Sequence, residues 1–416
     1  MNDEVILKAK SVHEAWAFLR NCNAKDKNDA ILKIAEKLNE NREKILRANQ
    51  KDVEIARKKG VRESLIDRLL LTDKRIDGMI EACEKISKLE DPVGEIIKSW
   101  IREDGLRISQ IRVPIGPIGI IYESRPNVTI ETSILALKSG NTVLLRGGSD
   151  AINSNISIVE TMKKALSESK LPNNSIEFIE NTDRKLVEKM LKLNQYLSLI
   201  VPRGGYGLIK FVVENSTIPV LETGVGNCHI YVDESANLEK SIGVIVNAKV
   251  QRPGTCNAVE KILVHKNIAK KFIPMIFNSL KENNVEVRGC ERTVEIVNEI
   301  KVATEEDWRM EYLDLIIAIK IVDSVDEAIE HINKYSTTHS EAILTENYSN
   351  AKKFVESVDS AAVYVNASTR FTDGGEFGFG GEIGISTQRL HARGPVGLRE
   401  LTTYKYVVLG DYHIRR

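Results

Sequence analysis

Hydrophobic side chains recur at helical spacing through the first part of the chain. Over residues 11–59 they stand three or four positions apart, and Gly60 ends the run. A second stretch of the same kind, residues 72–88, stops before Asp91 and Pro92. We predict charged, amphipathic helices that pack on the outside of another element and carry no evident chemistry.

Between residues 106 and 115 the pattern changes to alternating apolar and polar side chains, and Pro114 and Gly116 end it. Alternation predicts an edge strand or a ribbon. An unprotected strand edge requires a partner. We therefore predict that a final strand at residues 401–409 pairs with the ribbon, in this or another subunit, and that the ribbon serves dimerisation.

Short apolar runs alternate with amphipathic runs from residue 118 to residue 220. Strands are predicted at residues 118–122, 142–145, 176–179, 197–201 and 218–220, and helices at residues 128–138, 151–166, 183–193 and 207–214. Repeated βα units give right-handed crossovers and a mostly parallel sheet covered on both faces. A second α/β set has predicted strands at residues 229–232, 261–264, 315–322, 342–344 and 361–365. The fold class is therefore α/β.

Two glycine-containing loops follow predicted strands of the first set, at the end where parallel sheets bind ligands. They are Arg146–Ser149 and Arg203–Gly205, and the second opens a helix. A phosphate there would meet a basic side chain and exposed amides. Glycines that only form tight turns are the alternative. No G-x-G-x-x-G motif occurs, so the usual dinucleotide fingerprint is absent.

Cys256 lies in a loop of the second set, because Pro253 and Gly254 break the chain just before it. The thiolate is the reactive form of cysteine, and we expect Arg252 and exposed amides to lower the pKa of this thiol. Cys256 is therefore a candidate covalent nucleophile, with a partly buried free thiol as the alternative. The glycine loops belong to the other set, so a cleft between lobes is the predicted site.

Composition then narrows the class of ligand. A chain of 416 residues predicts two or three lobes. Lys+Arg and Asp+Glu both total 59, so the chain offers no electrostatic argument for nucleic acid or an anionic membrane. The cysteines show no metal-binding spacing, and no apolar run approaches the roughly 20 residues of a membrane helix. We expect a cytoplasmic enzyme that acts on small molecules, without a metal, nucleic-acid or membrane partner.

Five long segments stand in the same order as the motifs of one known family. They are Tyr122–Thr129, Leu221–Asp233, Lys249–Asn257, Val365–Glu376 and Leu390–Leu398. On these segments the chain resembles the gamma-glutamyl phosphate reductase (glutamate-5-semialdehyde dehydrogenase) family of the aldehyde dehydrogenase superfamily. That superfamily binds dinucleotides without the usual glycine fingerprint, in agreement with its absence here.

The resemblance implies an aldehyde dehydrogenase-like fold with three parts. A Rossmann-like cofactor-binding domain is expected at residues 1–104 and 117–227, and an α/β catalytic domain at residues 228–394. A small β oligomerisation element is expected at residues 105–116 and 395–416, and with it a homo-oligomer, either a dimer or a tetramer.

The resemblance also implies a reaction. NADPH would reduce L-glutamyl 5-phosphate to L-glutamate 5-semialdehyde and phosphate in proline biosynthesis, with NADP as the oxidised cofactor. Because the chain leaves no room for a fused kinase, a separate glutamate 5-kinase is expected to supply the substrate.

The catalytic residues carried over by the resemblance are Cys256, Asn127 and Glu222. Cys256 would form a thioester, which accepts hydride more readily than a carboxylate. Asn127 matches the asparagine that donates to the oxyanion alongside the backbone amide of the cysteine. Glu222 stands where aldehyde-oxidising relatives carry the base that activates water, and its role here stays open between proton transfer and holding the site.

The cofactor contacts follow from the two glycine loops. An arginine and a serine in the first loop match positions at the adenine ribose, and they would accept a 2′-phosphate that an acid would repel, which favours NADPH. The second loop matches the one under the pyrophosphate. A later glutamate resembles the one that holds the nicotinamide ribose, with a solvated surface acid as the alternative. The predicted contacts are Arg146, Gly147, Ser149, Arg203, Gly204, Gly205 and Glu311.

The carboxylate and the phosphate of the substrate each require a cation, and a bidentate arginine suits either anion. The sequence does not assign one arginine to one anion. A histidine is a further candidate, although a lone histidine is more often structural. The predicted substrate-binding residues are Arg125, Arg252, Arg370 and His339, and Arg393 lies in another matched segment.

Two other functions compete with the reductase. An ordinary aldehyde dehydrogenase would hydrolyse its thioester with Glu222 as the base, whereas the reductase run backwards requires inorganic phosphate. A catalytically silent scaffold would have lost its reactive positions, yet both Cys256 and Asn127 are present.

Overall fold

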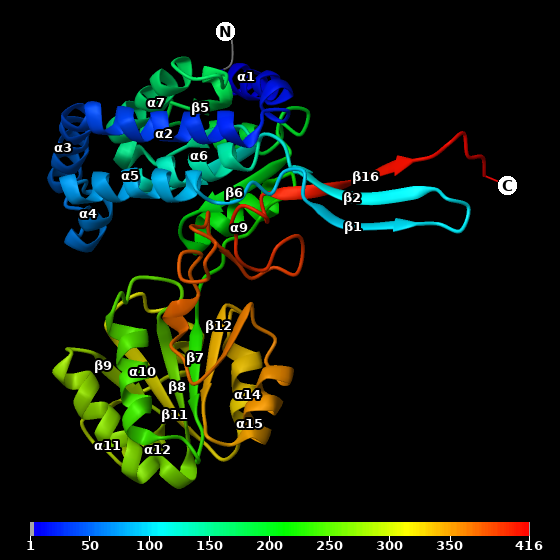
Figure 1. The fold of residues 1–416 in the computed structure, drawn as a ribbon. Helices are drawn as coiled ribbons and strands as arrows, with labels where there is room; N and C mark the ends of the chain where they lie inside the picture. Colours follow the sequence, from blue (N-terminus) through cyan, green and yellow to red (C-terminus); the bar gives the residue numbers. More distant parts are fainter. Residues whose placement is uncertain (1–3, 416) are drawn as a thin grey trace. The chain divides into compact units, whose positions relative to one another are not determined.

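The chain folds into two compact units, which the computed structural model describes over residues 4–415 (Figure 1). Unit 1 comprises residues 4–223, 378–384 and 396–415, and unit 2 comprises residues 224–377 and 385–395. Compact units need not coincide with domains, so the predicted domain limits remain predictions. Their ends at residues 1–3 and 416 lie outside the described residues. No described helix is both long and apolar enough to traverse a lipid bilayer.

Unit 1 opens with a set of five helices. They are α1 (Glu4–Leu19), α2 (Ala24–Glu40), α3 (Arg42–Lys58), α4 (Glu63–Leu69) and α5 (Asp73–Ser87). The helical run predicted over residues 11–59 is three helices, because asparagines interrupt it. Asn23 accepts the amide hydrogen of Asp26 at 2.9 Å and begins α2. Asn41 donates to the carbonyl of Lys37 at 2.8 Å where α2 ends.

A four-stranded parallel sheet, in the order β5-β4-β3-β6, forms the core of unit 1. Its strands are β3 (Ile118–Tyr122), β4 (Val143–Arg146), β5 (Ile176–Phe178) and β6 (Leu199–Arg203), and the helices between and after them are α6 (Pro126–Lys138), α7 (Ile152–Ser167), α8 (Lys185–Met190) and α9 (Tyr206–Asn215). The predicted parallel pairing is confirmed. The strand predicted at residues 218–220 is wrong, because a single bridge between Ile200 and Val220 is all that forms there.

A buried carboxylate on α3 fixes the start of α7. Asp52 is 2% exposed. Its oxygens accept the amide hydrogen of Asn153 at 3.2 Å and both the amide at 2.8 Å and the hydroxyl of Ser154 at 2.6 Å. A negative charge at a helix N-terminus satisfies free amides and the helix dipole together. The helical layer therefore holds the end of the glycine loop Arg146–Ser149, which leads into α7.

Three antiparallel strands of unit 1 form a separate sheet, the ribbon sheet, in the order β1-β2-β16 (Figure 1, cyan and red). They are β1 (Ile96–Ile101), β2 (Arg107–Pro114) and β16 (Thr402–Leu409). The predicted pairing of the last strand with the ribbon is confirmed and occurs within the same chain. Large apolar side chains stay exposed on both edge strands: Ile96, Ile97, Trp100, Ile101, Tyr404, Tyr406, Val408 and Leu409.

A seven-stranded parallel sheet, in the order β10-β9-β11-β8-β7-β12-β13, crosses unit 2. Its strands are β7 (Cys228–Val232), β8 (Val259–His265), β9 (Glu286–Gly289), β10 (Lys301–Val302), β11 (Ile316–Val322), β12 (Ser340–Leu344) and β13 (Ala362–Val365). Two short strands, β14 (Ile385–Ser386) and β15 (Gly394–Pro395), pair separately. The five predicted strands are confirmed. Strands β9 and β10, of 4 and 2 residues, were not predicted because they are too short to show a pattern.

Helices cover both faces of this sheet. They are α10 (Leu238–Val250), α11 (Lys266–Glu282), α12 (Glu291–Val294), α13 (Glu305–Arg309), α14 (Val325–Tyr335) and α15 (Tyr348–Ser357). Successive strand residues point to opposite faces. Ile230 accordingly packs with residues of α10 and α11, whereas the neighbouring Tyr231 packs with Ile332 of α14 and Phe354 of α15.

Candidate active site

The residues just before four neighbouring strands gather at one edge of the sheet in unit 2. Strands β11, β8, β7 and β12 are adjacent and parallel, so their amino ends share that edge. Cys256 precedes β8, Asn227 precedes β7, Glu311 precedes β11 and His339 precedes β12. Segments about a hundred residues apart in the chain therefore meet beside the candidate nucleophile.

Cys256 lies in the loop that joins α10 to β8, residues 251–258, which we call the nucleophile loop. The side chain is half-buried, in agreement with the predicted loop position. The segment Gly226–Cys228 backs this loop. A Cβ added to Gly226 would lie 1.4 Å from the carbonyl oxygen of Cys256, and the thiol of Cys228 donates to that same oxygen at 3.1 Å. Only glycine allows the two backbones to approach this closely.

Glu311 takes part in the same arrangement. Its carboxylate accepts the amide hydrogen of Gly226 at 2.8 Å, so it steadies the segment that backs the nucleophile loop. Sequence reasoning missed this role of Gly226, although the residue lies inside the matched segment Leu221–Asp233. A glycine in a matched segment, at a position that forms no turn, indicates that another backbone segment passes close to it.

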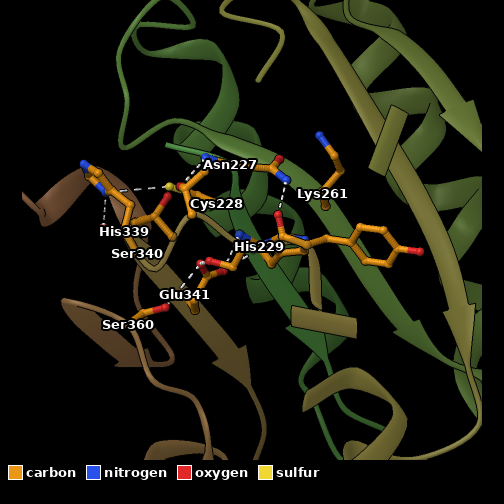
Figure 2. A network of polar contacts seen from close by, with 12 residues as sticks. Asn227, Cys228, His229, Lys261, His339, Ser340, Glu341 and Ser360 are labelled. Atoms are coloured by element: carbon orange, nitrogen blue, oxygen red, sulfur yellow. Dashed lines mark hydrogen bonds and ion pairs between the residues drawn. The ribbon is translucent and has the colours of Figure 1, made fainter. Parts of the chain in front are cut away.

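His339 lies in the interior of unit 2, fully buried. Its Nδ1 is 2.8 Å from the hydroxyl of Ser340, which is 2.7 Å from the hydroxyl of Thr372, and the thiol of Cys228 is 3.9 Å from Nδ1 (Figure 2). Burial lowers the pKa of His339 to about 4, so the ring is neutral at neutral pH. This position favours a structural role over the predicted contact with substrate.

A second histidine belongs to the same network (Figure 2). Glu341 accepts the backbone amide hydrogen of His229 at 2.6 Å and lies 3.1 Å from its Nδ1, with both side chains fully buried. Burial raises the pKa of Glu341 well above its ordinary value and lowers that of His229 well below. Burial therefore disfavours the charged form of both groups. His229 is part of this buried scaffold.

Charged side chains of β8 hold the segment that carries Glu311. Lys261 is fully buried, donates to the carbonyl of Met310 at 2.8 Å, and lies 4.3 Å from the centre of the Tyr312 ring. Its neighbour Glu260 pairs with Lys249 at 3.1 Å, and both are fully buried. Burial lowers the pKa of Lys261 to about 7 and raises that of Glu260 to about 7. Buried charges of this kind fix geometry more than they add stability.

The predicted substrate arginines occupy different surroundings. Arg252 is exposed in the nucleophile loop, whereas Arg370 is half-buried and donates to Gln251 and Thr255 of that loop. Arg393 donates to a carboxylate oxygen of Asp359 at 2.7 Å. Arg125 belongs to unit 1 and immediately precedes α6.

The remaining predicted catalytic residues also belong to unit 1. Asn127 lies in the first turn of α6, which Pro126 opens, and its side chain donates to Glu131 at 3.0 Å. Glu222 is half-buried beyond β6. The predicted catalytic residues are thus divided between the two units, and the predicted cleft between lobes stays a prediction.

The first glycine loop fits an anionic group. Arg146 is 9% exposed and donates to the carbonyls of Gly147 at 3.1 Å and Thr182 at 2.8 Å. Burial lowers its pKa, and its Nε finds no partner among the described residues. A Cβ on Gly147 would lie 2.2 Å from the side-chain nitrogen Nδ2 of Asn155, so the loop has no room for a side chain there. Ser149 is exposed at the far end of this loop.

The second glycine loop already holds a negative group. The amide of Gly205, at the start of α9, donates to the carboxylate of Glu123 at 2.9 Å. A Cβ on Gly204 would lie 2.6 Å from the same carboxylate oxygen, and Arg203 is half-buried beside them. Backbone amides and a cation therefore converge where an anion is favoured. Both glycine loops fit the phosphate groups of a dinucleotide.

The comparison with protein families agrees with this fold. The model of the aldehyde dehydrogenase family matches residues 2–297 and 306–407. The chain belongs to the aldehyde dehydrogenase family, and the predicted α/β fold of that family is confirmed.

Within the family the chain groups with the gamma-glutamyl phosphate reductases. A protein of that name from Thermotoga maritima is 71% identical over 413 residues, which cover 99% of this chain and 100% of the relative. The crystal structure of gamma-glutamyl phosphate reductase from Thermotoga maritima has a TM-score of 0.97 at 70% identity and covers 100% of both chains. The structure of an acetylating aldehyde dehydrogenase from Geobacillus thermoglucosidasius, 17% identical with a TM-score of 0.73 over 100% of both chains, shares the fold.

A Gly226→Ala substitution is expected to displace the nucleophile loop, because the new methyl group would overlap the Cys256 carbonyl. We expect a loss of roughly 1–3 kcal/mol in unfolding free energy and a much slower reaction of Cys256 with iodoacetamide. The matched control is Gly243→Ala on α10, where a Cβ meets nothing within 4 Å. Thermal unfolding and alkylation rates measure both effects, and equal behaviour of the two variants would contradict the close approach.

The buried histidines make stability depend on pH. Unfolded His339 binds a proton below about pH 6.5, whereas the folded ring stays neutral down to about pH 4. The unfolded state therefore binds more protons in this window, and stability falls as pH falls. At pH 4.5 the loss from this residue is roughly 2–3 kcal/mol relative to pH 7. Thermal midpoints of wild type and His339→Asn at both pH values test this, and equal pH dependence of the two proteins would refute it.

Proposed function

We propose that this oxidoreductase of the aldehyde dehydrogenase family reduces L-glutamyl 5-phosphate to L-glutamate 5-semialdehyde and phosphate, in proline biosynthesis. One observation carries the proposal: the 71% identity, over 99% of the chain, to proteins named gamma-glutamyl phosphate reductase. The half-buried Cys256, on a loop that other segments of unit 2 hold in place, supports it from the chemistry.

Cys256 acts as the nucleophile. Its thiolate attacks the acyl carbon of the substrate, a carbon–sulfur bond forms, and phosphate leaves with the electrons of the carbon–oxygen bond. The thioester that results is a better hydride acceptor than a carboxylate, because sulfur donates less electron density to the carbonyl. After reduction the carbon–sulfur bond breaks, and the aldehyde leaves as the thiolate is restored. No water is consumed, so Glu222 has no hydrolytic role and serves proton transfer or positioning.

Asn127 and the backbone amide of Cys256 stabilise the negative charge that develops on the carbonyl oxygen in both addition steps. Asn127 stands at the start of α6, where helix geometry fixes its backbone. Arg125 and Arg252 are the proposed cations for the anionic groups of the substrate. His339 stays within the buried network.

The proposed cofactor is NADPH, which supplies the hydride when it is bound. Arg146 with its buried, unsatisfied Nε, together with exposed Ser149, suits the 2′-phosphate. Gly147 keeps that loop free of a side chain. The second loop would hold the pyrophosphate, and Glu311 would add a contact to the nicotinamide ribose while it keeps its bond to Gly226. The proposed pyrophosphate contacts are Arg203, Gly204 and Gly205.

An acyl phosphate hydrolyses readily, so a kinase that phosphorylates the side-chain carboxylate of glutamate must act immediately upstream. We propose a separate glutamate 5-kinase in the cytoplasm as that enzyme. The aldehyde product carries an amine on the third carbon from the aldehyde carbon, so it closes by itself to the five-membered ring of 1-pyrroline-5-carboxylate.

The reverse reaction tests the function. With pyrroline-5-carboxylate and NADP⁺, turnover is expected to depend on inorganic phosphate, and NAD⁺ is expected to be a poorer cofactor. Cys256→Ala should lose about a thousandfold or more in rate. The control Cys22→Ser alters a thiol of unit 1 and should keep full activity. Turnover without phosphate, or turnover that survives in Cys256→Ala, would remove the assignment.

We also propose that the ribbon sheet mediates a homo-oligomer, a dimer or a tetramer. Two edge strands expose apolar side chains there, and such edges pair with other chains unless they are covered. Val408 is 52% exposed on β16, so Val408→Lys should lower the oligomeric mass measured by light scattering without unfolding the chain. The control is Val355→Lys, on α15 and 46% exposed. A wild-type protein that is monomeric at micromolar concentration would refute the proposal.

A further inference from the structure

Hydrogen bonds from side chains to backbone carbonyls join two loops of unit 2 beside Cys256. The hydroxyl of Thr369 donates to the carbonyl of Asn257 at 2.7 Å, and the side-chain amide of Asn257 donates to the carbonyl of Thr372 at 2.9 Å. Asn257 is 4% exposed, and it immediately follows the candidate nucleophile. The segment around Arg370 therefore follows any movement of the nucleophile loop.

The guanidinium of Arg370 closes this junction from the side. Its Nε donates to the side-chain oxygen of Gln251 at 2.9 Å, and its Nη1 donates to the hydroxyl of Thr255 at 3.1 Å and to the side-chain oxygen of Asn257. The Thr255 hydroxyl also lies 2.8 Å from the carbonyl of Arg252. One planar cation thus contacts the residues on both sides of Cys256 and the first residue of the loop.

The guanidinium of Arg370 places a positive charge beside the nucleophile loop. Burial lowers the pKa of Arg370, the positive charge of Arg252 lowers it further, and the negative charges of Asp373, Cys256 and Glu376 raise it. The guanidinium contacts Thr255 and Asn257, the residues on either side of Cys256. A positive charge beside a cysteine favours the thiolate. Arg252 differs, because its side chain is exposed.

We infer that Arg370 is a positioning residue that holds the nucleophile loop around Cys256, and that it is not a ligand for the anionic groups of the substrate. Only the expected effects on kcat and KM rest on the proposed function. As an anion ligand, Arg370 would have to give up bonds to Gln251, Thr255 and Asn257, whereas exposed Arg252 gives up none of these. A bidentate contact with an anion uses either Nε or Nη1 together with Nη2, and both Nε and Nη1 already donate to the protein itself.

An Arg370→Lys substitution distinguishes the effect of the positive charge from the effect of the hydrogen-bond geometry. A single ammonium keeps the positive charge but lacks the planar fork that reaches Gln251 and Thr255 at once. Arg370→Lys should therefore preserve much of the thiolate stabilisation and still lose the fixed loop. Arg370→Ala should lose both.

The test uses the full-length protein without substrate or cofactor. The rate of Cys256 alkylation by iodoacetamide is measured against pH, with the modified residue identified by mass spectrometry. For Arg370→Ala we expect a rate at pH 7 at least about tenfold lower and a midpoint of the pH profile about one unit higher. For Arg370→Lys we expect a midpoint close to that of the wild type. Added guanidinium ion should partly restore the rate of Arg370→Ala.

Steady-state kinetics of the reverse reaction give the second readout. Arg370→Ala should lower kcat by about a hundredfold with little change in KM for phosphate or pyrroline-5-carboxylate, whereas Arg252→Ala should raise KM for one of these anions. The matched control is Arg292→Ala, an exposed arginine of unit 2 that donates to Asp323 at 2.9 Å. It should match the wild type in every readout.

An unchanged alkylation profile in Arg370→Ala, together with a higher KM and an unchanged kcat, would overturn the inference and make Arg370 a substrate ligand. Thermal unfolding identifies a variant that has lost its fold. In that event Gln251→Met, which removes one bond from an exposed residue, decides the question: slower alkylation supports the inference, and the wild-type profile overturns it. Because alkylation requires no substrate, failure of the proposed reaction would appear separately, as absent phosphate-dependent turnover in the wild type.

Discussion

The close approach of two backbones at Gly226 is the constraint on which the rest of unit 2 depends. The Cys256 carbonyl lies where a side chain on residue 226 would begin, so the nucleophile loop and the start of β7 form one packed layer. A parallel sheet makes this possible, because it brings the amino ends of neighbouring strands to one edge. Glu311 then ties the third segment to the same glycine. The site is thus built from backbone contacts first, and its side chains are arranged upon them.

Burial away from water shifts the pKa values of the ionisable groups in the interior of unit 2, behind that layer. Burial raises the pKa of Glu341 and lowers that of His229, so it disfavours the charged form of both, and it moves the pKa values of Glu260 and Lys261 to about 7. Every one of these groups has a hydrogen-bond or charge partner, which is the condition for a polar group to remain in a protein core. Such a network has few alternative arrangements, so it fixes the loops above it with little freedom.

Much of this structure follows from sequence patterns. Parallel strands such as β3 and β7 appear as short apolar runs between breakers, and Cys256 stands in a loop because Pro253 and Gly254 precede it. Short elements such as β10 leave no period to detect. Contacts between distant segments also escape a linear reading: an arginine that holds a loop and one that binds an anion have the same sequence signal. The burial of His339 likewise depends on the packing of loops that no local pattern specifies.

The carboxylate of Glu123 at the amide of Gly205 has a consequence for recognition in unit 1. Because a negative group already resides at this helix start, an incoming anion must exchange with it rather than fill a vacancy. The affinity for that anion then equals the attraction of the Gly205 amide for the anion minus its attraction for the Glu123 carboxylate. Salt screens both attractions, so it changes their difference less than it changes either one. The charge density and the shape of an anion therefore decide whether it binds here. A compact, doubly charged oxyanion displaces the Glu123 carboxylate, whereas a weakly charged anion does not.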